Sequence, residues 1–401
     1  MTNATRRTVS SATGFWIVAA VFLTTMAYST IPTPLYTLYQ QRDGFAVWVI
    51  TMIFAAYAVG VVLSLFFAGH LSDVFGRRRM LVIAVLVSAL SAVMFLVWND
   101  VTGLLAARLV NGISIGILTA TATAHLAELR AHARPDEKPI VAASVAGAAN
   151  LGGLALGPLI GGVFVEFLPA PLVLPHAVFL VLLIAAAGAL VGVPETVVPA
   201  APRPRYRPQH LAFPPGSRPA FIAAGLGAFA SFALFGLFTS LAPTFLVDAF
   251  HAPSHLLAGA TPFAVFASAA IAQVVLARVA LRRQLTIAIV GCAVGLGAIA
   301  VGAVLPSLAV FLLGGVAGGV GVGILFRSAI ATAAGLAAPG RRGETLALIF
   351  LIAYCGLALP VIAVGVSLLF FSETAVLLVF TALVLVATVS AGIVMRRRAA
   401  A

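Results

Sequence analysis

The sequence predicts an all-α membrane protein that crosses the bilayer twelve times. Two observations predict this fold class. Hydrophobic residues make up 62% of the 401 residues and charged residues only 8%, and the mean hydropathy is +1.15. A soluble domain needs far more charge to cover its surface, whereas lipid-facing helices do not.

Each predicted helix is a run long enough to span, because a spanning helix needs about 20 mostly apolar residues. In chain order the twelve runs cover roughly residues 14–39, 46–69, 79–98, 102–126, 139–166, 172–193, 219–247, 256–277, 285–305, 307–332, 344–371 and 374–395. The first run is too long and too rich in Pro and Tyr for a cleaved signal sequence, so we interpret it as a retained first helix.

The positive charge follows the membrane topology. If the amino terminus is cytoplasmic, 20 of the 23 Lys and Arg residues lie in cytoplasmic segments, Arg42 alone lies outside, and Arg108 and Arg327 lie within helices. This asymmetry obeys the positive-inside rule and predicts that both termini are cytoplasmic. The net charge of +12 therefore indicates topology and contact with anionic lipids, and no nucleic-acid partner is expected.

One long polar interruption, at residues 194–218, divides the chain. It holds seven Pro and four Arg, a composition typical of an extended linker. The predicted domains are therefore an amino-terminal six-helix half (1–193), this linker, and a carboxy-terminal six-helix half (219–401).

The two halves resemble each other at three places in the same order. The matching segments are Gly112–Leu118 with Gly319–Leu325, Gly153–Pro158 with Gly356–Pro360, and Pro34–Tyr36 with Pro243–Phe245. Two repeats of the same orientation predict a substrate site near the midplane between the halves, reached by alternating access.

The loop between the second and third runs is the most distinctive segment. Residues 69–81 read GHLSDVFGRRRML and bring one Asp and three Arg together in an almost uncharged chain. The loop resembles the pattern G-x-L-[AS]-D-[RK]-x-G-[RK]-[RK]-x-x-L of the major facilitator superfamily, except at Val74. The resemblance implies a gating loop in which Asp73 faces the start of the eleventh helix. Its predicted members are Gly69, Asp73, Gly76, Arg77 and Arg78. The alternative is a basic turn that serves topology only.

The fourth run carries an Arg inside the membrane. Arg108, followed by Gly112 and Gly116, resembles the family pattern R-x-x-x-G-x-x-x-G, which implies proton coupling or substrate contact. Asn111 lies on the same helical face. An ionised Arg at this depth should face protein or water rather than lipid. The alternative is a side chain that snorkels to the outer interface. Arg327, near the cytoplasmic end of the tenth run, is also interpreted as snorkelling.

The fifth run carries small residues in a specific pattern. It resembles the motif G-x8-G-x3-G-P-x2-G-G that is found mainly in exporters, with Ser144 in place of the first Gly. The matching residues are Gly153, Gly157, Pro158, Gly161 and Gly162. Small residues allow close helix contact and Pro bends the helix, so this segment could seal the outer side. The motif favours export over uptake.

Polar and aromatic residues predict the substrate cavity. On one face of the first run lie Thr25, Tyr28, Ser29, Pro32 and Tyr36, and the seventh run offers Phe232, Phe235 and Thr239, with Asn150 and Gln273 as further candidates. Hydroxyls on one side and aromatic rings on the other suit an amphipathic organic substrate. The alternative is that some of these groups only bond between helices.

Acidic residues are absent from the middle of every run. All eleven Asp and Glu fall in loops or at helix ends, which disfavours a strongly cationic substrate and leaves proton coupling to Glu166, Asp248 or the substrate itself. The histidines, including His176, are expected at the surface. No catalytic constellation, metal motif or cofactor motif is present in the sequence, so an enzyme is not expected.

These patterns together predict a monomeric secondary transporter of a bacterial-type inner membrane. It is expected to export small amphipathic organic compounds in exchange for protons, with the proton gradient as its driving force. The nearest alternative is a proton-coupled uptake symporter. An alternative of another class is a transport-inactive sensor or scaffold on the same fold.

Overall fold

The computed structural model is all-helical in its described part, which comprises residues 8–68, 71–197, 218–338 and 341–399. The first elements are α1 (Ser11–Thr30), η1 (Thr33–Leu35), α2 (Tyr36–Asp43), α3 (Val47–Ala68), α4 (Leu71–Phe75), α5 (Arg77–Val97), α6 (Val101–Ala133), α7 (Ile140–Phe167) and α8 (Leu174–Val191). The later elements are α9 (Arg218–Ser240), α10 (Ala242–Asp248), α11 (His255–Val275), α12 (Leu281–Val304), α13 (Leu308–Leu336), α14 (Arg342–Ser367) and α15 (Glu373–Arg398).

Twelve segments in the described ranges are long and apolar enough to cross a membrane. This number and the all-helical class confirm the prediction from the sequence. Two of the predicted runs are broken near a Pro, the first after Thr30 and the seventh at Leu241. Pro cannot donate the backbone hydrogen bond of a continuous helix, and Pro32, Pro34 and Pro243 lie at these breaks.

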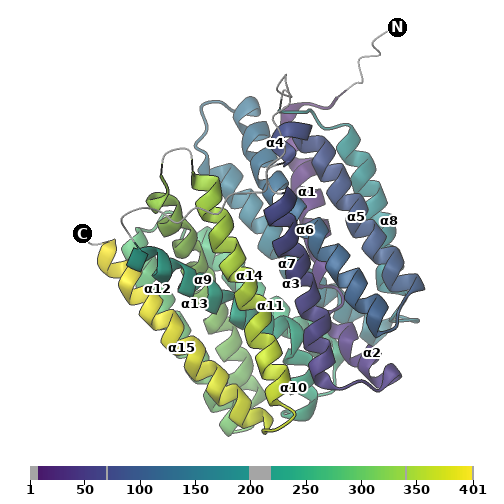
Figure 1. Cartoon of the computed structure of the whole chain (residues 1–401), viewed down its shortest axis with the longest axis vertical. Coiled ribbons are helices and arrows are strands. Elements are labelled where there is room, and N and C mark those ends of the chain that lie inside the picture. Colours follow the sequence, from purple (N-terminus) through teal and green to yellow (C-terminus); the bar gives the residue numbers. More distant parts are fainter. Residues whose placement is uncertain (1–7, 69–70, 198–217, 339–340, 400–401) are drawn as a thin grey trace.

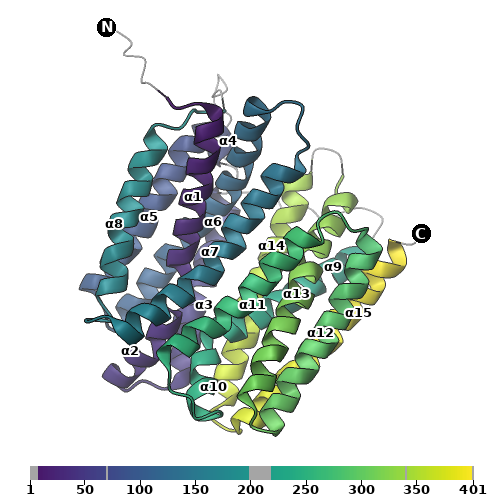
Figure 2. The ribbon, with the colours of Figure 1, turned by 180° about the vertical axis from the view of Figure 1, so that it is seen from behind.

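The helices form two bundles. Figure 1 shows α1–α8 on one side of the molecule and α9–α15 on the other, and the reverse view of Figure 2 shows the same division. The bundles meet where α7 packs against α11 and α3 packs against α14. Most of residues 194–218, predicted to be the linker between them, lies outside the described residues.

The charged ends of the helices define the two ends of the molecule. Arg77, Arg130 and Arg397 lie at the basic end, whereas Trp98 and Glu166 lie at the far end. Several helices start on a side-chain cap, which satisfies backbone N–H groups that have no partner inside the helix. Asp100, for example, accepts a hydrogen bond of 2.8 Å from the backbone N–H of Gly103 at the start of α6.

Candidate functional site

A cavity of about 180 Å³ lies between the two bundles. Both bundles line it, as expected for a binding site at the interface of two repeats. Its lining residues are Ser29, Thr30, Phe54, Tyr57, Arg108, Thr119, Gly147, Asn150, Leu151 and Leu154 from the first bundle and Phe232, Phe235, Thr239, Phe266, Gln273, Phe326, Phe350, Tyr354 and Leu357 from the second.

Arg108 is the one charged side chain among these lining residues. It is 1% exposed. One guanidinium nitrogen, Nη1, donates a hydrogen bond of 2.6 Å to the carbonyl oxygen of Ser29. The guanidinium carbon lies 4.8 Å from the ring centroid of Tyr57, 5.8 Å from that of Phe54 and 5.9 Å from that of Tyr36. These are cation–π distances, so the aromatic rings offset part of the cost of burying the charge.

The polar contacts of Arg108 are nevertheless incomplete. Its Nε has no hydrogen-bond partner in the described structure. None of the ion pairs found among the described residues includes Arg108. The cavity wall therefore carries a buried positive charge without a carboxylate from the protein.

The second bundle contributes an aromatic wall. The Phe235 and Phe266 rings stack with centroids 4.6 Å apart, and Phe232 lies 4.8 Å from Phe326 and 5.3 Å from Tyr354. The rings hold one another in place, and such pairs contribute about 0.5–1.5 kcal/mol beyond their buried area. A planar apolar group would therefore meet a preformed surface on this side.

Six of the ten side chains predicted to form the cavity line it. They are Ser29, Asn150, Phe232, Phe235, Thr239 and Gln273. Gln273 is partly used inside its own bundle, because its Nε2 donates a hydrogen bond of 2.9 Å to the carbonyl oxygen of Gly323. Arg327, interpreted from the sequence as snorkelling, donates from Nη1 to the carbonyl oxygen of Gln273 at 3.0 Å.

The other four predicted cavity residues lie elsewhere. Thr25 is buried and its hydroxyl donates to the carbonyl oxygen of Val21, one helical turn earlier. Tyr28 packs inside the first bundle, Pro32 lies at the break after α1, and Tyr36 covers Arg108 without lining the cavity. Asn111, predicted to lie on the same helical face as Arg108, donates from Nδ2 to the hydroxyl of Ser88 on α5 at 3.2 Å.

The histidine at the start of α8 corrects one expectation from the sequence. His176 is fully buried rather than at the surface, and so is His125 on α6. The Nδ1 and Nε2 of His176 each lie 3.4 Å from a hydroxyl oxygen, that of Tyr28 and that of Tyr39, and its ring stacks on Phe95 at 4.5 Å. Tyr28 therefore faces His176, whereas its neighbour Ser29 lines the cavity. The polar residues predicted on one face of α1 thus contact two different places.

Two tyrosines that the sequence did not single out join the bundles at the cavity. Tyr57 of α3 and Tyr354 of α14 both line the cavity, where these two helices pack against each other. Each is the one Tyr of its predicted run, and buried Tyr hydroxyls usually have a hydrogen-bond partner. An isolated Tyr near the middle of a span was therefore a usable signal for the cavity.

The predicted gating loop is held at the basic end of the first bundle. Asp73 pairs with Arg77 at 2.6 Å, and Arg77 also pairs with Glu128 at 2.9 Å and bonds the Ser72 hydroxyl at 2.7 Å. The partners of Asp73 thus lie within this bundle. Gly69 falls outside the described residues.

Glu195 ties the end of the first bundle to the same loop. Its two carboxylate oxygens accept hydrogen bonds from the backbone N–H groups of Arg77 at 2.8 Å and Arg78 at 3.2 Å. This is an anion at a helix N-terminus, which the α5 dipole stabilises. Gly76, at φ 97°, precedes the helix, and a Cβ there would lie 2.4 Å from a Glu195 oxygen. Only Gly fits both the backbone angle and the contact.

The small residues of α7 face two neighbours. A Cβ on Gly153, Gly157 or Gly161 would meet carbonyl oxygens of the first predicted span at 2.5, 2.1 and 2.7 Å. Gly162 faces the second bundle, where a Cβ would meet the His255 carbonyl oxygen at 2.8 Å. These glycines allow the helix backbones to touch directly.

Contacts at the far end fasten the two bundles together. The Pro158 carbonyl oxygen would lie 2.2 Å from a Cβ on Gly259 of α11. One Glu166 carboxylate oxygen accepts hydrogen bonds from the backbone N–H groups of His255 at 2.9 Å and Leu256 at 3.2 Å. Glu166 of one bundle therefore caps the first helical turn of α11 in the other.

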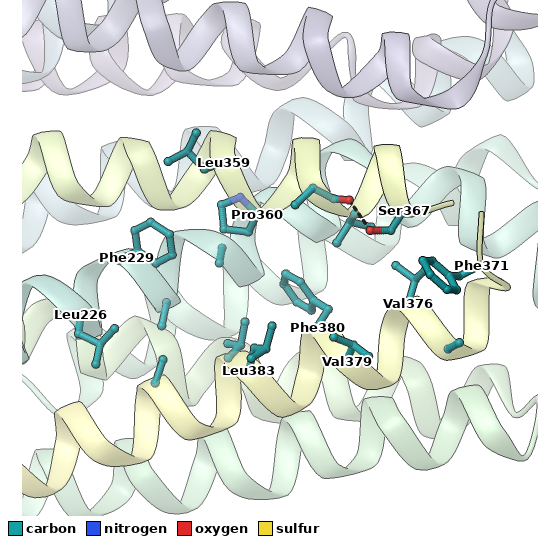
Figure 3. Close-up of a pocket in the computed structure, with 17 residues that line it drawn as sticks. Leu226, Phe229, Leu359, Pro360, Ser367, Phe371, Val376, Val379, Phe380 and Leu383 are labelled. Carbon is teal, nitrogen blue, oxygen red and sulfur yellow. Dashed lines mark hydrogen bonds between the residues drawn. The ribbon is translucent and has the colours of Figure 1, made fainter. Parts of the chain in front are cut away.

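A second pocket, of about 580 Å³, lies between α9, α14 and α15. Figure 3 shows that its lining is apolar, with Phe229 and Pro360 among the side chains that face it. The Ser367 hydroxyl there donates to the carbonyl oxygen of Ala363 in its own helix. Leu383 is 67% exposed, so the pocket opens to the outside of the bundle. It offers no charged group to orient a solute, and the central cavity is therefore the candidate site.

The twelve apolar helices and the cavity between two bundles define a multi-pass membrane transporter. The chain belongs to the Major Facilitator Superfamily, whose family model matches residues 17–359. It is a secondary transporter rather than an enzyme, and such transporters bind small-molecule substrates.

Two solved structures share the fold. The human organic anion transporter MFSD10 (TETRAN) superposes with a TM-score of 0.68 at 19% identity, covering 94% of this chain and 98% of that one. A variant of the nucleoside transporter NupG superposes with a TM-score of 0.71 at 12% identity, covering 95% and 99%.

Sequence relatives match shorter segments. The arabinose-proton symporter of Bacillus subtilis (strain 168) is 36% identical over 94 residues, which are 23% of this chain and 19% of that protein. The uncharacterized MFS-type transporter MJ1560 of Methanocaldococcus jannaschii is 26% identical over 151 residues, 38% of this chain and 37% of that protein. The matched segments thus span well under half of either relative.

Proposed function

We propose that this chain exports small amphipathic organic compounds in exchange for protons by alternating access. The observation that carries the proposal is the cavity between the bundles, with Arg108 on one wall and aromatic rings on the other. A substrate with a polar group and an apolar body would satisfy both walls.

The two predicted halves, residues 1–193 and 219–401, would rock against each other about this cavity. We assign the basic end to the cytoplasm, with both termini there, because the Lys and Arg residues concentrate at that end. The far end then faces outward in a bacterial-type inner membrane. A monomer would suffice, because one chain supplies the whole cavity.

The contacts support an inward-facing state for this conformation. Pro158 and Gly162 lie against α11 at the far end, and Glu166 caps that helix. At the basic end, Asp73 pairs with Arg77 inside its own bundle. In the outward-facing state, Asp73 would instead face the N-terminus of α14, whose unpaired N–H groups attract an anion. This exchange is the gating role that we propose for the loop.

Export is favoured by the α7 motif, Gly153, Gly157, Pro158, Gly161 and Gly162. Two of its residues, Pro158 and Gly162, lie against α11 where the bundles are fastened. Uptake by proton symport is the second candidate, favoured by the 36% identity of one segment to an arabinose-proton symporter. Protons move inward in both functions, and the two differ in whether the substrate moves against the protons or together with them.

Everted vesicles from a host that lacks its own efflux pumps would test the proposal. A respiration-driven proton gradient is recorded with a pH-sensitive dye while diverse organic compounds are added. Export by antiport predicts that particular compounds partly collapse the gradient, and that vesicles lacking the protein or carrying Arg108→Ala do not respond.

Other outcomes would reject export. Accumulation of a compound in right-side-out vesicles, driven by an inward proton gradient, would establish the symporter. The absence of any flux in both vesicle types, with the folded protein present, would favour a transport-inactive sensor or scaffold.

A further inference from the structure

We infer that the substrate of the central cavity is a small aromatic carboxylate, with Arg108 as its counter-ion. This inference rests on the proposed function in one respect: it takes the central cavity as the substrate site. It adds the chemical class of the occupant.

The first step is the missing partner of Arg108. A guanidinium offers five N–H donors in a planar fork that matches a carboxylate. Here Arg108 Nη1 donates a hydrogen bond to the Ser29 carbonyl oxygen. Arg108 Nε has no partner in the described structure, although the side chain is only 1% exposed. A buried charge with unpaired donors is strongly unfavourable unless an anion neutralises it.

The protein itself does not supply that anion. All eleven Asp and Glu residues lie in the described part of the chain, and none of them lines the cavity. An occupant with a carboxylate would supply the anion that the protein does not. A carboxylate can bind a guanidinium through two parallel hydrogen bonds, which fixes its orientation as well as its charge.

The rest of the cavity specifies the body of the occupant. Rings from Phe232, Phe235, Phe266, Phe326 and Tyr354 form the wall contributed by the second bundle. Aromatic rings prefer to pack offset or edge to face against one another. A flat ring attached to the carboxylate would use this wall, whereas a sugar with hydroxyls on every face would leave most of them unpaired.

The size of the cavity limits the occupant to about one ring. Its volume is about 180 Å³, and an apolar cavity of roughly 150 Å³ holds one benzene molecule. Benzoate is the simplest probe that combines one ring with one carboxylate.

The same geometry rejects close analogues. A protonated amine such as benzylamine would place a second positive charge beside Arg108, with no carboxylate in the cavity lining to balance it. Benzamide has the same ring but no charge, and its neutral hydrogen bonds are weaker than those of a carboxylate. The expected order of binding is therefore benzoate, then benzamide, then benzylamine.

Binding to the purified full chain in lipid nanodiscs tests the inference, measured as the rise in melting temperature with ligand concentration near neutral pH. We expect saturable stabilisation by benzoate, binding of benzamide that is about tenfold or more weaker, and no stabilisation by benzylamine. Arg108→Gln should abolish the preference for benzoate over benzamide. Arg42→Gln, which removes an Arg from an exposed pair with Asp43, should keep it.

The ranking in the unmodified protein decides the question even if Arg108→Gln fails to fold. Equal binding of benzoate and benzamide, tighter binding of benzylamine, or no binding of benzoate would overturn the inference. The result is separable from that of the vesicle experiment. Benzoate binding without proton exchange would reject export and keep the site, whereas proton exchange driven only by neutral or cationic compounds would keep export and reject the anion.

Discussion

Replacing Gly259 by Ala should open the far end of the molecule. The added Cβ would lie 2.2 Å from the Pro158 carbonyl oxygen, about 1.2 Å short of ordinary van der Waals contact, which begins at 3.4 Å. The obstacle is backbone on both sides, so no side chain can rotate away. The α7 and α11 backbones must separate by about that distance to accommodate the methyl group.

The magnitude follows from the cost of overpacking. Inserting a methylene into a close-packed contact destabilises it by about 1–3 kcal/mol. The strain falls on the conformation in which α7 and α11 touch and not on one in which they are apart. The equilibrium between them should therefore shift by about five- to 150-fold toward the state that is open at the far end.

Spin labels on the two bundles would measure the shift. Val173 and Val247 lie at the far end on different bundles and are 50% and 41% exposed, so cysteines there can be labelled once Cys292 and Cys355 are replaced. Pulsed electron paramagnetic resonance should show a longer distance between the labels in Gly259→Ala.

The same helices offer a matched control. Gly152 lies on α7, but a Cβ there would have no neighbour within 4 Å, so Gly152→Ala should leave the distance unchanged. An unchanged distance distribution in a correctly folded Gly259→Ala protein would refute the close-contact argument, as would an equal change in Gly152→Ala.

Three further predictions concern the basic end. Asp73→Asn should lower turnover severely yet leave substrate binding and melting temperature almost unchanged. The Asp73 side chain is 60% exposed in its ion pair with Arg77, and exposed pairs contribute about 0–1 kcal/mol. Equal transport rates in the variant and the unmodified protein would contradict this. Glu195→Gln should lower stability by about 1 kcal/mol in urea unfolding, because the N-terminus of α5 loses its anion, and full stability would show that the cap is dispensable. The hydrogen bond from Arg130 holds the pKa of Glu137 below its ordinary value of 4.5. A depressed folded-state pKa gives stability that is present above the unfolded-state pKa and lost as the pH falls through the folded-state value. The difference in melting temperature between the unmodified protein and Glu137→Gln should therefore begin to shrink as the pH falls below about 4.5 and vanish once Glu137 is protonated in the folded protein. A constant difference would argue against the pair.

The spans could be predicted from hydropathy, but their ends could not. The fourth span was placed at residues 102–126, whereas α6 runs on to Ala133. The added turns carry Glu128 and Arg130, which bind Arg77 and Glu137 beyond the apolar stretch. A hydropathy window detects only the segment that lipid requires, and helix propensity with ion pairs extends the helix past it.

The cavity could be predicted in part. Ser29 and Tyr28 are neighbours on α1, and helical spacing placed both on the polar face. Only Ser29 lines the cavity, because the Tyr28 ring lies against His176 of α8, 148 residues away in the chain. Periodicity identifies a polar face but does not tell which neighbouring helix that face meets. The same limit applies to Asn111, which helical spacing placed on the face of Arg108 and whose side chain bonds Ser88 on α5.

The solitary charge of Arg108 has an electrical consequence. A membrane voltage acts on each elementary charge by about 2.3 kcal/mol per 100 mV. In an alternating-access cycle the voltage drops across whichever side of the cavity is closed. The position of Arg108 relative to that drop therefore changes as the protein returns without substrate. A monovalent anion would cancel the charge in the loaded protein. The voltage would then act on the return step without substrate and have almost no effect on the step with substrate bound. An interior-negative potential would favour the state in which the cavity faces the cytoplasm.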